Sequence, residues 1–435
     1  MKVGIRKETQ YPSERRAALT PKHVKILTEQ NIEVYVEPAE QRVFTSEEYT
    51  NAGAQISNDL SECDIILGVK EVPINDLIPN KPYVFFSHTI KGQNYNMPLL
   101  QAILDKNITL FDYELVKNEK GFRIIFFGKF AGYVGTIDSL WLLGKRLKSE
   151  GIETPFSKIT QAPNYDNLDE AKESIKKVGE EIIENGLPEQ MVPFITGFTG
   201  YGNVSKGAQE LYDLLPCEEI KVNNLENFIN TGNFSNKKVY KVEFKEEDMY
   251  EHNSGEKFNF DNFVKNPQDY KSKLYKYLPY FTILINGIYW EEKFPKHVTK
   301  SYFKKVYTEN KNPKMKVIGD ITCDIEGSVE MTVKATSSEN PSYVYEPLTG
   351  EIKDGVEGNG PVILAVDKLP AELPKEASKT FGDALLPFVK VLAEADYLKS
   401  FENLDIPREF KEAIITHKGK LAPDFEYLGK FLQKL

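Results

Sequence analysis

The chain has 435 residues, which is more than one typical hydrophobic core uses and predicts two domains. Hydrophobic residues make up 40% of the chain and charged residues 28%, which is enough to bury cores beneath a water-soluble surface. The net charge of -10 and the lack of a basic stripe argue against a nucleic-acid partner.

Further function classes are excluded by what the sequence lacks. No run approaches the roughly 20 apolar residues that span a bilayer, and the first residues show no signal-peptide pattern, so we expect a cytoplasmic protein without a membrane partner. Three isolated cysteines form neither a disulfide framework nor a metal knuckle, and five scattered histidines add no metal motif. No metal site is predicted.

In the first third of the chain, short β-rich runs alternate with helical stretches, which indicates a parallel α/β arrangement. Thr20 and Pro21 read as the N-cap and first residue of a helix that Asn31 ends. Most of the strand runs are continuously apolar, as expected for strands buried on both faces. The predicted strands are 2–6, 32–36, 64–69, 83–86, 108–111 and 123–127.

A helix with a broad apolar face, 137–147, begins the second part, and we place a domain boundary at about residue 135. A polar helix, 168–184, leads into an apolar strand at 192–198. The segment 224–276 has no clear pattern. Further predicted strands are 220–223, 238–244, 281–288, 315–321 and 362–369, and further helices are 381–395, 410–416 and 427–435.

A glycine-rich turn follows the strand at 192–198. Gly200-Tyr201-Gly202-Asn203-Val204-Ser205 precedes a helical run, and a strand, a glycine turn and a helix in this order are typical of a dinucleotide-binding site. Glycines let the backbone approach a pyrophosphate, whose charge then lies at the helix N-terminus. Ser205 stands where a third glycine is usual, and its small side chain still allows close packing. The competing interpretation is an ordinary surface turn.

The second strand of such a fold ends roughly 20 residues later, where an acidic residue would bind a free ribose 2′-hydroxyl. The end predicted here is Asn223, which is neutral and favours NADP(H) weakly over NAD(H). Glu218 and Glu219 lie close enough to reverse this preference if the strand ends earlier. NAD(H) is therefore not excluded.

Ionisable residues follow several predicted strands of the first part. Carboxyl ends of neighbouring parallel strands converge on one crevice, which would bring a lysine, a histidine and two carboxylates together. Taken alone, each lysine or glutamate at a strand end is more often solvated, and a lone histidine is more often structural, so only the cluster indicates function. The residues are Glu14, Arg15, Arg16, Lys70, Glu71, His88, Lys91, Glu114 and Arg123.

Several motifs resemble a known superfamily. Glu14 to Pro21 (ERRAALTP), Gly68 to Pro73 (GVKEVP) and Phe86 to Lys91 (FSHTIK) resemble the alanine dehydrogenase and transhydrogenase N-terminal superfamily. HTIKGQNYNMPLL from His88, FTGYGNVSKGAQ from Phe198 and INGIYW from Ile285 resemble more closely the lysine–2-oxoglutarate reductase half of aminoadipate semialdehyde synthase, a saccharopine dehydrogenase that forms lysine in reverse. No second, glutamate-forming half is recognised.

The resemblance implies an α/β fold of two Rossmann-like domains with mostly parallel sheets and a central active-site cleft. It implies a substrate and catalytic domain at 1–135, a dinucleotide-binding domain at 136–327, and a segment at 328–435 that returns to the substrate domain. Carried over by motif, Lys70 and His88 match an acid–base pair, and Glu71 and Glu114 match carboxylates that tune it.

The same resemblance assigns binding roles. Arg16 and Arg123 match binders of substrate carboxylates, Lys91 a pocket lysine and Phe127 a pocket aromatic, with Arg15 as the alternative to Arg16. Asp324 resembles an aspartate near the nicotinamide, with Asp320 as the alternative. The cofactor-binding set is Gly200, Gly202, Asn203, Val204, Ser205, Asn223, Asn286, Gly287 and Asp324.

The expected function is NADPH-dependent, reversible condensation of L-lysine with 2-oxoglutarate to saccharopine, the first step of saccharopine-pathway lysine degradation. Two alternatives stay open: reductive amination of pyruvate, as in alanine dehydrogenase, and a nucleotide-binding sensor without turnover. The acid–base residues argue against the sensor, because nucleotide binding alone needs none. The sequence leaves open the physiological direction, a homo-oligomer and a partner enzyme that processes saccharopine.

Overall fold

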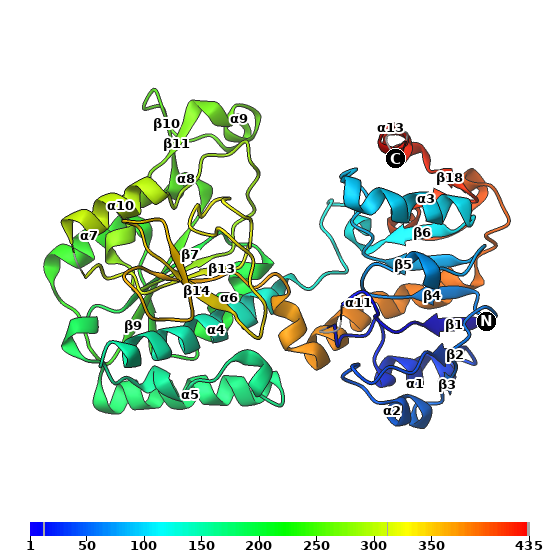
Figure 1. Ribbon diagram of the computed structural model, residues 1–435, viewed down its shortest axis with the longest axis horizontal. Coiled ribbons are helices and arrows are strands. Elements are labelled where there is room, and N and C mark those ends of the chain that lie inside the picture. The colour runs from blue at the N-terminus through cyan, green and yellow to red at the C-terminus, as the bar shows by residue number, and fades with distance from the viewer. Residues whose placement is uncertain (12–13, 311, 433–435) are drawn as a thin grey trace. The chain divides into compact units, whose positions relative to one another are not determined.

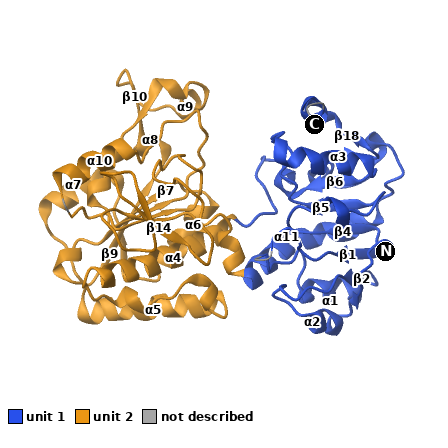
Figure 2. Ribbon diagram, viewed as in Figure 1, with its two compact units in different colours: residues 1–127, 374–435 blue, residues 128–373 orange. Residues whose placement is uncertain are grey.

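The computed structural model describes residues 1–11, 14–310 and 312–432, which divide into two compact units. Unit 1 comprises Met1–Phe127 and Pro374–Leu435, and unit 2 comprises Gly128–Leu373 (Figure 2). These bounds differ from the expected 135 and 327. Unit 2 begins earlier because its first helix starts at Gly128, and it continues further because the strands at 342–364 join its sheet.

Unit 1 is built on an eight-stranded sheet of order β18-β17-β6-β5-β4-β1-β2-β3 (Figure 1). The strands β3-β2-β1-β4-β5-β6 are parallel and have the order of a dinucleotide-binding fold, whereas β17 and β18 pair antiparallel. The strands are β1 (Lys2–Ile5), β2 (Glu33–Val36), β3 (Gln55–Ile56), β4 (Ile65–Leu67), β5 (Pro82–Phe85), β6 (Thr109–Asp112), β17 (Ile414–His417) and β18 (Lys420–Leu421).

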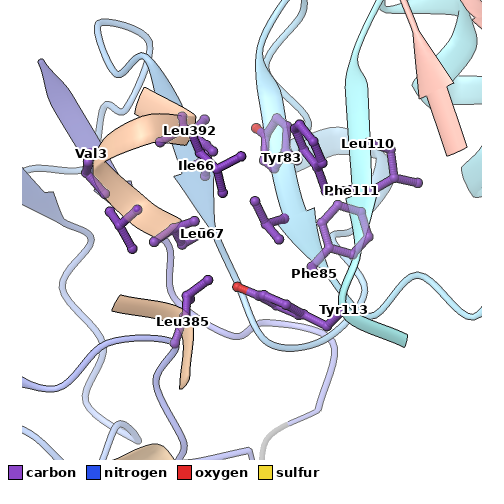
Figure 3. Packing of buried hydrophobic residues seen from close by; sticks show 14 of the residues in the cluster. Val3, Ile66, Leu67, Tyr83, Phe85, Leu110, Phe111, Tyr113, Leu385 and Leu392 are labelled. Carbon is purple, nitrogen blue, oxygen red and sulfur yellow. The ribbon is translucent and has the colours of Figure 1, made fainter. Parts of the chain in front are cut away.

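Helices cover this sheet, and α11 is the longest of those described in unit 1. Leu385 and Leu392 of α11 lie against Ile66 and Leu67 of β4 (Figure 3). Strands β4 and β5 are apolar at every position and buried, because helices on both faces exclude water from a parallel sheet. The helices are α1 (Pro21–Glu29), α2 (Ser46–Asn51), α3 (Met97–Asp105), α11 (Pro374–Glu394), α12 (Arg408–Lys411) and α13 (Gly429–Leu432).

Two predicted elements of unit 1 are wrong. Residues 123–127 form no strand, and only Arg123 makes an isolated bridge, to Lys117. The predicted helix at 410–416 is the short α12 followed by β17, because Ile414 and Thr416 are β-branched and pair with β6. The cap at Thr20 with Pro21 is confirmed. The predicted helix at 427–435 reduces to α13, and residues 433–435 lie outside the described part of the chain.

Unit 2 also has an eight-stranded sheet, of order β15-β14-β16-β13-β12-β7-β9-β8 (Figure 1). Six of these strands are parallel to one another. At one edge, β14 pairs antiparallel with both β16 and β15. The mixed α/β fold with two largely parallel sheets is therefore confirmed. The strands are β7 (Ile195–Thr199), β8 (Cys217–Glu219), β9 (Val239–Phe244), β12 (Ile283–Asn286), β13 (Val317–Asp320), β14 (Ser342–Tyr345), β15 (Ile352–Asp354) and β16 (Val362–Leu364).

The segment without a clear sequence pattern contains a small antiparallel pair, β10 (Tyr250–His252) and β11 (Tyr270–Ser272). In Figure 1 this pair lies close to α9 at one end of unit 2. Aromatic rings hold it together: Phe263 stacks on Tyr250 with centroids 4.6 Å apart. The helices of unit 2 are α4 (Gly128–Ser149), α5 (Leu168–Asn185), α6 (Asn203–Tyr212), α7 (Val222–Thr231), α8 (Glu246–Met249), α9 (Phe260–Lys265) and α10 (Lys300–Glu309).

The strand expected at 220–223 is wrong, and this error matters for the nucleotide. The strand after α6 is β8, which ends at Glu219, and residues 222–231 form helix α7. On the side of β7 away from β12 the neighbouring strand is β9, and β8 pairs with β9 at the edge of the sheet. Sequence order and spatial order differ here because the short, polar β8 belongs at an edge, whereas β9 is buried at five of its six positions and lies between two strands.

Helices α4 and α6 approach each other through glycines. A Cβ at Gly132 would lie 2.0 Å from the carbonyl oxygen of Val204, and one at Gly207 would lie 2.2 Å from that of Lys129. No side chain fits at these contacts. The lack of a side chain at Gly207 therefore lets α6, the helix that follows the glycine turn, pack directly against α4.

A buried carboxyl group of α4, Asp138, forms a pair with the buried carboxyl group of Glu372. Asp138 Oδ1 accepts the backbone N–H of Ala162 at 2.8 Å, and Glu372 Oε1 accepts the hydroxyl of Ser338 at 2.5 Å. Within the described residues, Asp138 Oδ2 and Glu372 Oε2 are buried without a donor. Burial and the charge of Glu372 hold the pKa of Asp138 well above its usual range, and burial also raises the pKa of Glu372. A proton on Asp138, donated to Glu372, satisfies both.

We expect Asp138→Asn to stabilise the protein at neutral pH. Raised folded-state pKa values mean that the stability the pair contributes is complete below its unfolded pKa of about 4 and is lost as the pH rises. The amide of the variant donates to Glu372 at every pH, so its free energy of unfolding at pH 7 should exceed that of the wild type by about 1–3 kcal/mol.

Urea unfolding between pH 4 and 8 measures this effect. The difference between variant and wild type should vanish near pH 4. Asp261→Asn, an exposed change on α9, is the control and should leave the pH profile unaltered. A variant that is less stable than the wild type at pH 7 would contradict a shared proton.

Candidate active site and dinucleotide site

The predicted polar residues of unit 1 follow the carboxyl ends of adjacent strands. Lys70 and Glu71 follow β4, His88 follows β5, and Glu114 follows β6. Because β4, β5 and β6 are neighbours in one parallel sheet, these residues lie along the same edge. Lys70 is half-buried, and its positive charge is felt by both Glu71 and Glu14. The structure thus brings most of the predicted polar group together.

His88 and Glu71 form a direct pair. Nδ1 of His88 lies 2.5 Å from Oε1 of Glu71, which is buried. Burial alone would raise the pKa of Glu71, but the hydrogen bond and the charge of His88 outweigh it and lower that pKa. His88 has a left-handed backbone, with φ of 53°, and Asn96 donates to its carbonyl oxygen at 3.1 Å. The imidazole is held in one orientation, with Nδ1 committed to the carboxylate.

Arg16 lies in a buried, aromatic setting. Its Nε and Nη2 donate to the two carboxylate oxygens of Glu14 at 2.7 and 2.5 Å, and its guanidinium lies 4.1 Å from the ring centroid of Phe127. Phe127 in turn stacks on Phe381 of α11. Arg15 is exposed, so the geometry favours Arg16 of the two predicted arginines.

The remaining predicted residues of unit 1 lie nearer solvent. Arg123 is exposed and forms an ion pair with Glu114, which is half-buried. Lys91 is exposed in the turn after His88. Arg123 is therefore tied to the site through Glu114, whereas the structure shows no such tie for Lys91 among the described contacts.

Two buried carboxylates that the sequence reasoning missed hold the strand ends in place. Glu8 accepts the backbone N–H groups of Val69 and Lys70, each at 2.8 Å, which fixes the loop that carries Lys70. Asp112 accepts the N–H and hydroxyl of Ser87 and the N–H of Glu114. Glu8 follows β1 and Asp112 ends β6, and this position at a strand end was the sequence signal for a functional or structural role. A lone acidic residue at a strand end usually faces solvent, so the sequence did not single out either carboxylate.

In unit 2 the predicted glycine turn joins β7 to α6. Gly200 has φ of +84°, which favours glycine, and a Cβ there would lie 3.0 Å from the backbone of Ile288. Gly202 is the N-cap of α6, and a Cβ on it would meet no atom within 4 Å. The turn thus presents an open helix N-terminus, which suits a pyrophosphate. Asn203 is exposed, Val204 is half-buried, and Ser205 is buried.

Asn286 forms the centre of a buried network at the ends of β7, β12 and β13. Its Oδ1 accepts from Thr199 at 2.6 Å, and it lies 3.1 Å from Nε2 of His297. Its Nδ2 donates to Asp320 at 2.8 Å and to Ser328 at 2.9 Å. The side chain therefore uses its hydrogen-bonding capacity within the protein and ties the ends of β7, β12 and β13 together.

The two aspartates proposed near the nicotinamide differ in exposure. Asp320 is fully buried and accepts hydrogen bonds from Asn286, Thr322 and Thr332, so it is structural. Asp324 lies in the following turn and is exposed. The geometry favours Asp324 as the aspartate that a nucleotide could reach. Asn223, in contrast, lies exposed within α7 and does not end the strand beside the glycine turn, which corrects its assignment.

In 1–11, 14–310 and 312–432, no three His, Cys, Asp or Glu side chains are grouped to hold a metal ion. None of the helices in these ranges is both long and apolar enough to cross a membrane.

The first part of the chain matches a family model. Residues 4–134 match the N-terminal domain of alanine dehydrogenase and PNT. The matched residues contain Lys70, Glu71 and His88. The resemblance inferred from the motifs is confirmed.

Curated relatives extend the similarity beyond this domain. The chain is 36% identical over 441 residues to bovine mitochondrial alpha-aminoadipic semialdehyde synthase and 37% identical over 445 residues to that of Arabidopsis thaliana, with 98% of the chain covered. It spans 47% and 41% of those proteins, about half their length. It is 28% identical to saccharopine dehydrogenase [NAD(+), L-lysine-forming] of Candida albicans, covering 91% of this chain and 92% of that protein.

Solved structures show the same fold. An L-alanine dehydrogenase aligns with a TM-score of 0.65 at 18% identity and covers 99% of this chain and 100% of its own. A transhydrogenase from Sinorhizobium meliloti aligns with a TM-score of 0.56 at 15% identity, covering 98% and 100%. The fold of the alanine dehydrogenase/PNT N-terminal domain, continued by a second α/β unit, is thereby shown.

Proposed function

We propose that the chain condenses L-lysine with 2-oxoglutarate to saccharopine, reversibly, using a nicotinamide dinucleotide, as the first step of saccharopine-pathway lysine degradation. The observation that carries this proposal is 36% identity to an aminoadipic semialdehyde synthase across 98% of the chain, together with the His88–Glu71 pair beside Lys70. The chain covers about half of that relative, so the proposal is limited to one reaction.

Reductive amination needs a neutral amine, a polarised ketone and loss of water from the carbinolamine, so one group must take and return protons. We assign this to Lys70, which would deprotonate the ε-amine of lysine and then serve the carbinolamine. His88 would protonate the carbonyl oxygen of 2-oxoglutarate through Nε2, because Nδ1 is bound to Glu71. Glu114, at the next strand end, would adjust the charge around both.

Substrate carboxylates would be held by Arg16 and Arg123. Both guanidiniums already donate to protein carboxylates, Glu14 and Glu114, so each is preset in orientation and keeps further N–H donors for a substrate carboxylate. Phe127, stacked beneath Arg16, would form an apolar wall, and Lys91 would act at the rim. These groups would set the keto carbon in a fixed position.

The residues of unit 2 fit a nicotinamide dinucleotide. The open N-cap at Gly202 would hold the pyrophosphate, Val204 and Gly287 would line the turn, and Asp324 would lie towards the nicotinamide. When bound, the dinucleotide supplies the hydride. The expected preference for NADP(H) rested on Asn223 and on the resemblance, and Asn223 lies within α7 rather than at the end of a strand beside the turn, so the dinucleotide proposed is NAD(P)H.

The test is a spectrophotometric assay of NADH or NADPH oxidation by the purified chain. Oxidation that requires lysine and 2-oxoglutarate together supports the proposal. Oxidation with pyruvate and ammonium alone would replace it by an alanine-dehydrogenase reaction, the alternative that the fold similarity to L-alanine dehydrogenase favours. Nucleotide binding without turnover of either pair would indicate the sensor.

Glu71 should act through His88, and a double-mutant cycle tests this. We expect Glu71→Gln to lower kcat about tenfold in the wild-type background and to have little further effect in His88→Gln, a coupling of about 1–3 kcal/mol. The physical reason is that the carboxylate orients an imidazole that the double variant lacks. Equal losses in both backgrounds would mean that Glu71 contacts the substrate independently.

A further inference from the structure

The strand beside the glycine turn is β9, and its carboxyl end carries a glutamate. All five residues of β7 pair in parallel with β9, ending with Phe198 opposite Glu243 and Thr199 opposite Phe244. In dinucleotide-binding folds the end of this neighbouring strand lies at the adenosine ribose. A carboxylate there binds the free 2′-hydroxyl, whereas a 2′-phosphate is accommodated by a nearby arginine.

The Glu243 side chain is oriented towards the helix of the glycine turn. Its Oε2 accepts a hydrogen bond from Nε2 of Gln209 on α6 at 2.6 Å, and the same Nε2 lies 3.1 Å from Oγ of Ser205. Gln209 is buried and Glu243 is half-buried, so the contact is held within the fold. The carboxylate therefore lies on the α6 side of the sheet, the side to which the turn leads.

The groups around Glu243 make the neighbourhood negative. Glu246 and Glu247 lie just after β9, beyond Lys245. Their negative charges act on the phenol of Tyr201 in the glycine turn. The charge of Glu246 is the largest cause that raises the pKa of Tyr201, and Glu247 and Glu243 add to it. Lys245 lies 5.7 Å from the centroid of the Tyr201 ring, and Lys241 of β9 is paired with Asp213. The three carboxylates of Glu243, Glu246 and Glu247 thus outnumber the ammonium of Lys245 at this strand end, which disfavours a doubly charged phosphate.

We infer that this chain selects NAD(H) over NADP(H), and that Glu243 is the residue that makes the selection. The inference rests on the dinucleotide site of the proposed function, but it does not depend on lysine or 2-oxoglutarate as substrates. Glu243 replaces Asn223 as the determinant, because Asn223 lies within helix α7 and the strand that adjoins β7 here is β9.

Binding measurements on the full chain test this directly. Titration with NADH and NADPH, followed by nicotinamide fluorescence, should give a Kd for NADH about 10- to 100-fold lower, the effect expected of a hydrogen bond to a charged group. Glu243→Gln removes the charge and keeps the shape, so it should reduce the ratio of the two Kd values at least about tenfold, mainly by improving NADPH binding.

Glu219→Gln is the matched control, because Glu219 ends β8 at the sheet edge and should leave the ratio unchanged. A wild-type chain that binds NADPH as tightly as NADH would overturn the inference, and so would a shift of the ratio by Glu219→Gln equal to that by Glu243→Gln. Selective NADH binding without turnover of lysine and 2-oxoglutarate would uphold the inference while refuting the proposed reaction.

Discussion

Lys70→Met should lower kcat for reductive amination by about 10²- to 10⁴-fold, the contribution of a positioned acid–base group. Methionine keeps the length and apolar stem of lysine but carries no proton. The fold should be retained, because the described bond that fixes this loop runs from the backbone N–H of Lys70 to Glu8 rather than from its ammonium. The measurement is steady-state kinetics with saturating lysine, 2-oxoglutarate and NADH.

The control for this prediction is Lys25→Met, an exposed lysine on α1. It should leave kcat unchanged, and Lys70→Met should leave the Kd for NADH unchanged, because the glycine turn belongs to the other compact unit. Near-full turnover by a folded Lys70→Met chain would remove Lys70 from the mechanism. A simultaneous loss of NADH binding would show that the variant is misfolded or that the assignment of the two sites is wrong.

Asn286→Leu should destabilise the protein by about 3 kcal/mol or more. Its amide bonds Thr199, Asp320 and Ser328, and lies beside His297, all at buried positions. Leucine is close in volume but leaves those partners unsatisfied, and each buried unsatisfied group costs about 1–3 kcal/mol. The urea midpoint should fall accordingly, with the m-value unchanged.

Asn224→Leu is the control, since Asn224 is exposed on α7, and its effect should stay within about 0.5 kcal/mol. A second readout separates the network from a simple loss of stability. NADH binding to folded Asn286→Leu should weaken, because the network holds Gly287 at the turn. A variant as stable as the control would show that the network contributes little.

Residues at strand ends were predictable because a parallel sheet converts sequence order into position. Lys70, His88 and Glu114 each follow an apolar run, so their approach to one edge follows from the sheet alone. The pairs they form were not predictable from spacing. Glu71 meets His88 across two strands, and Glu8 reaches the N–H groups of Val69 and Lys70 from the end of a third.

The sequence by itself determined the fold class, the glycine turn and the resemblance to the alanine dehydrogenase superfamily. Apolar periodicity, turn residues and sequence motifs are properties of short segments, which is why the sequence alone was enough. Only the tertiary structure decided which strand adjoins that turn. The order β8-β9-β7 follows burial: β9 is buried at five of its six positions and lies between two strands, whereas β8 is polar and mostly exposed at the edge. This strand order makes Glu243, rather than Asn223, the residue inferred to lie at the ribose. The sequence near either residue does not show which strand adjoins the glycine turn.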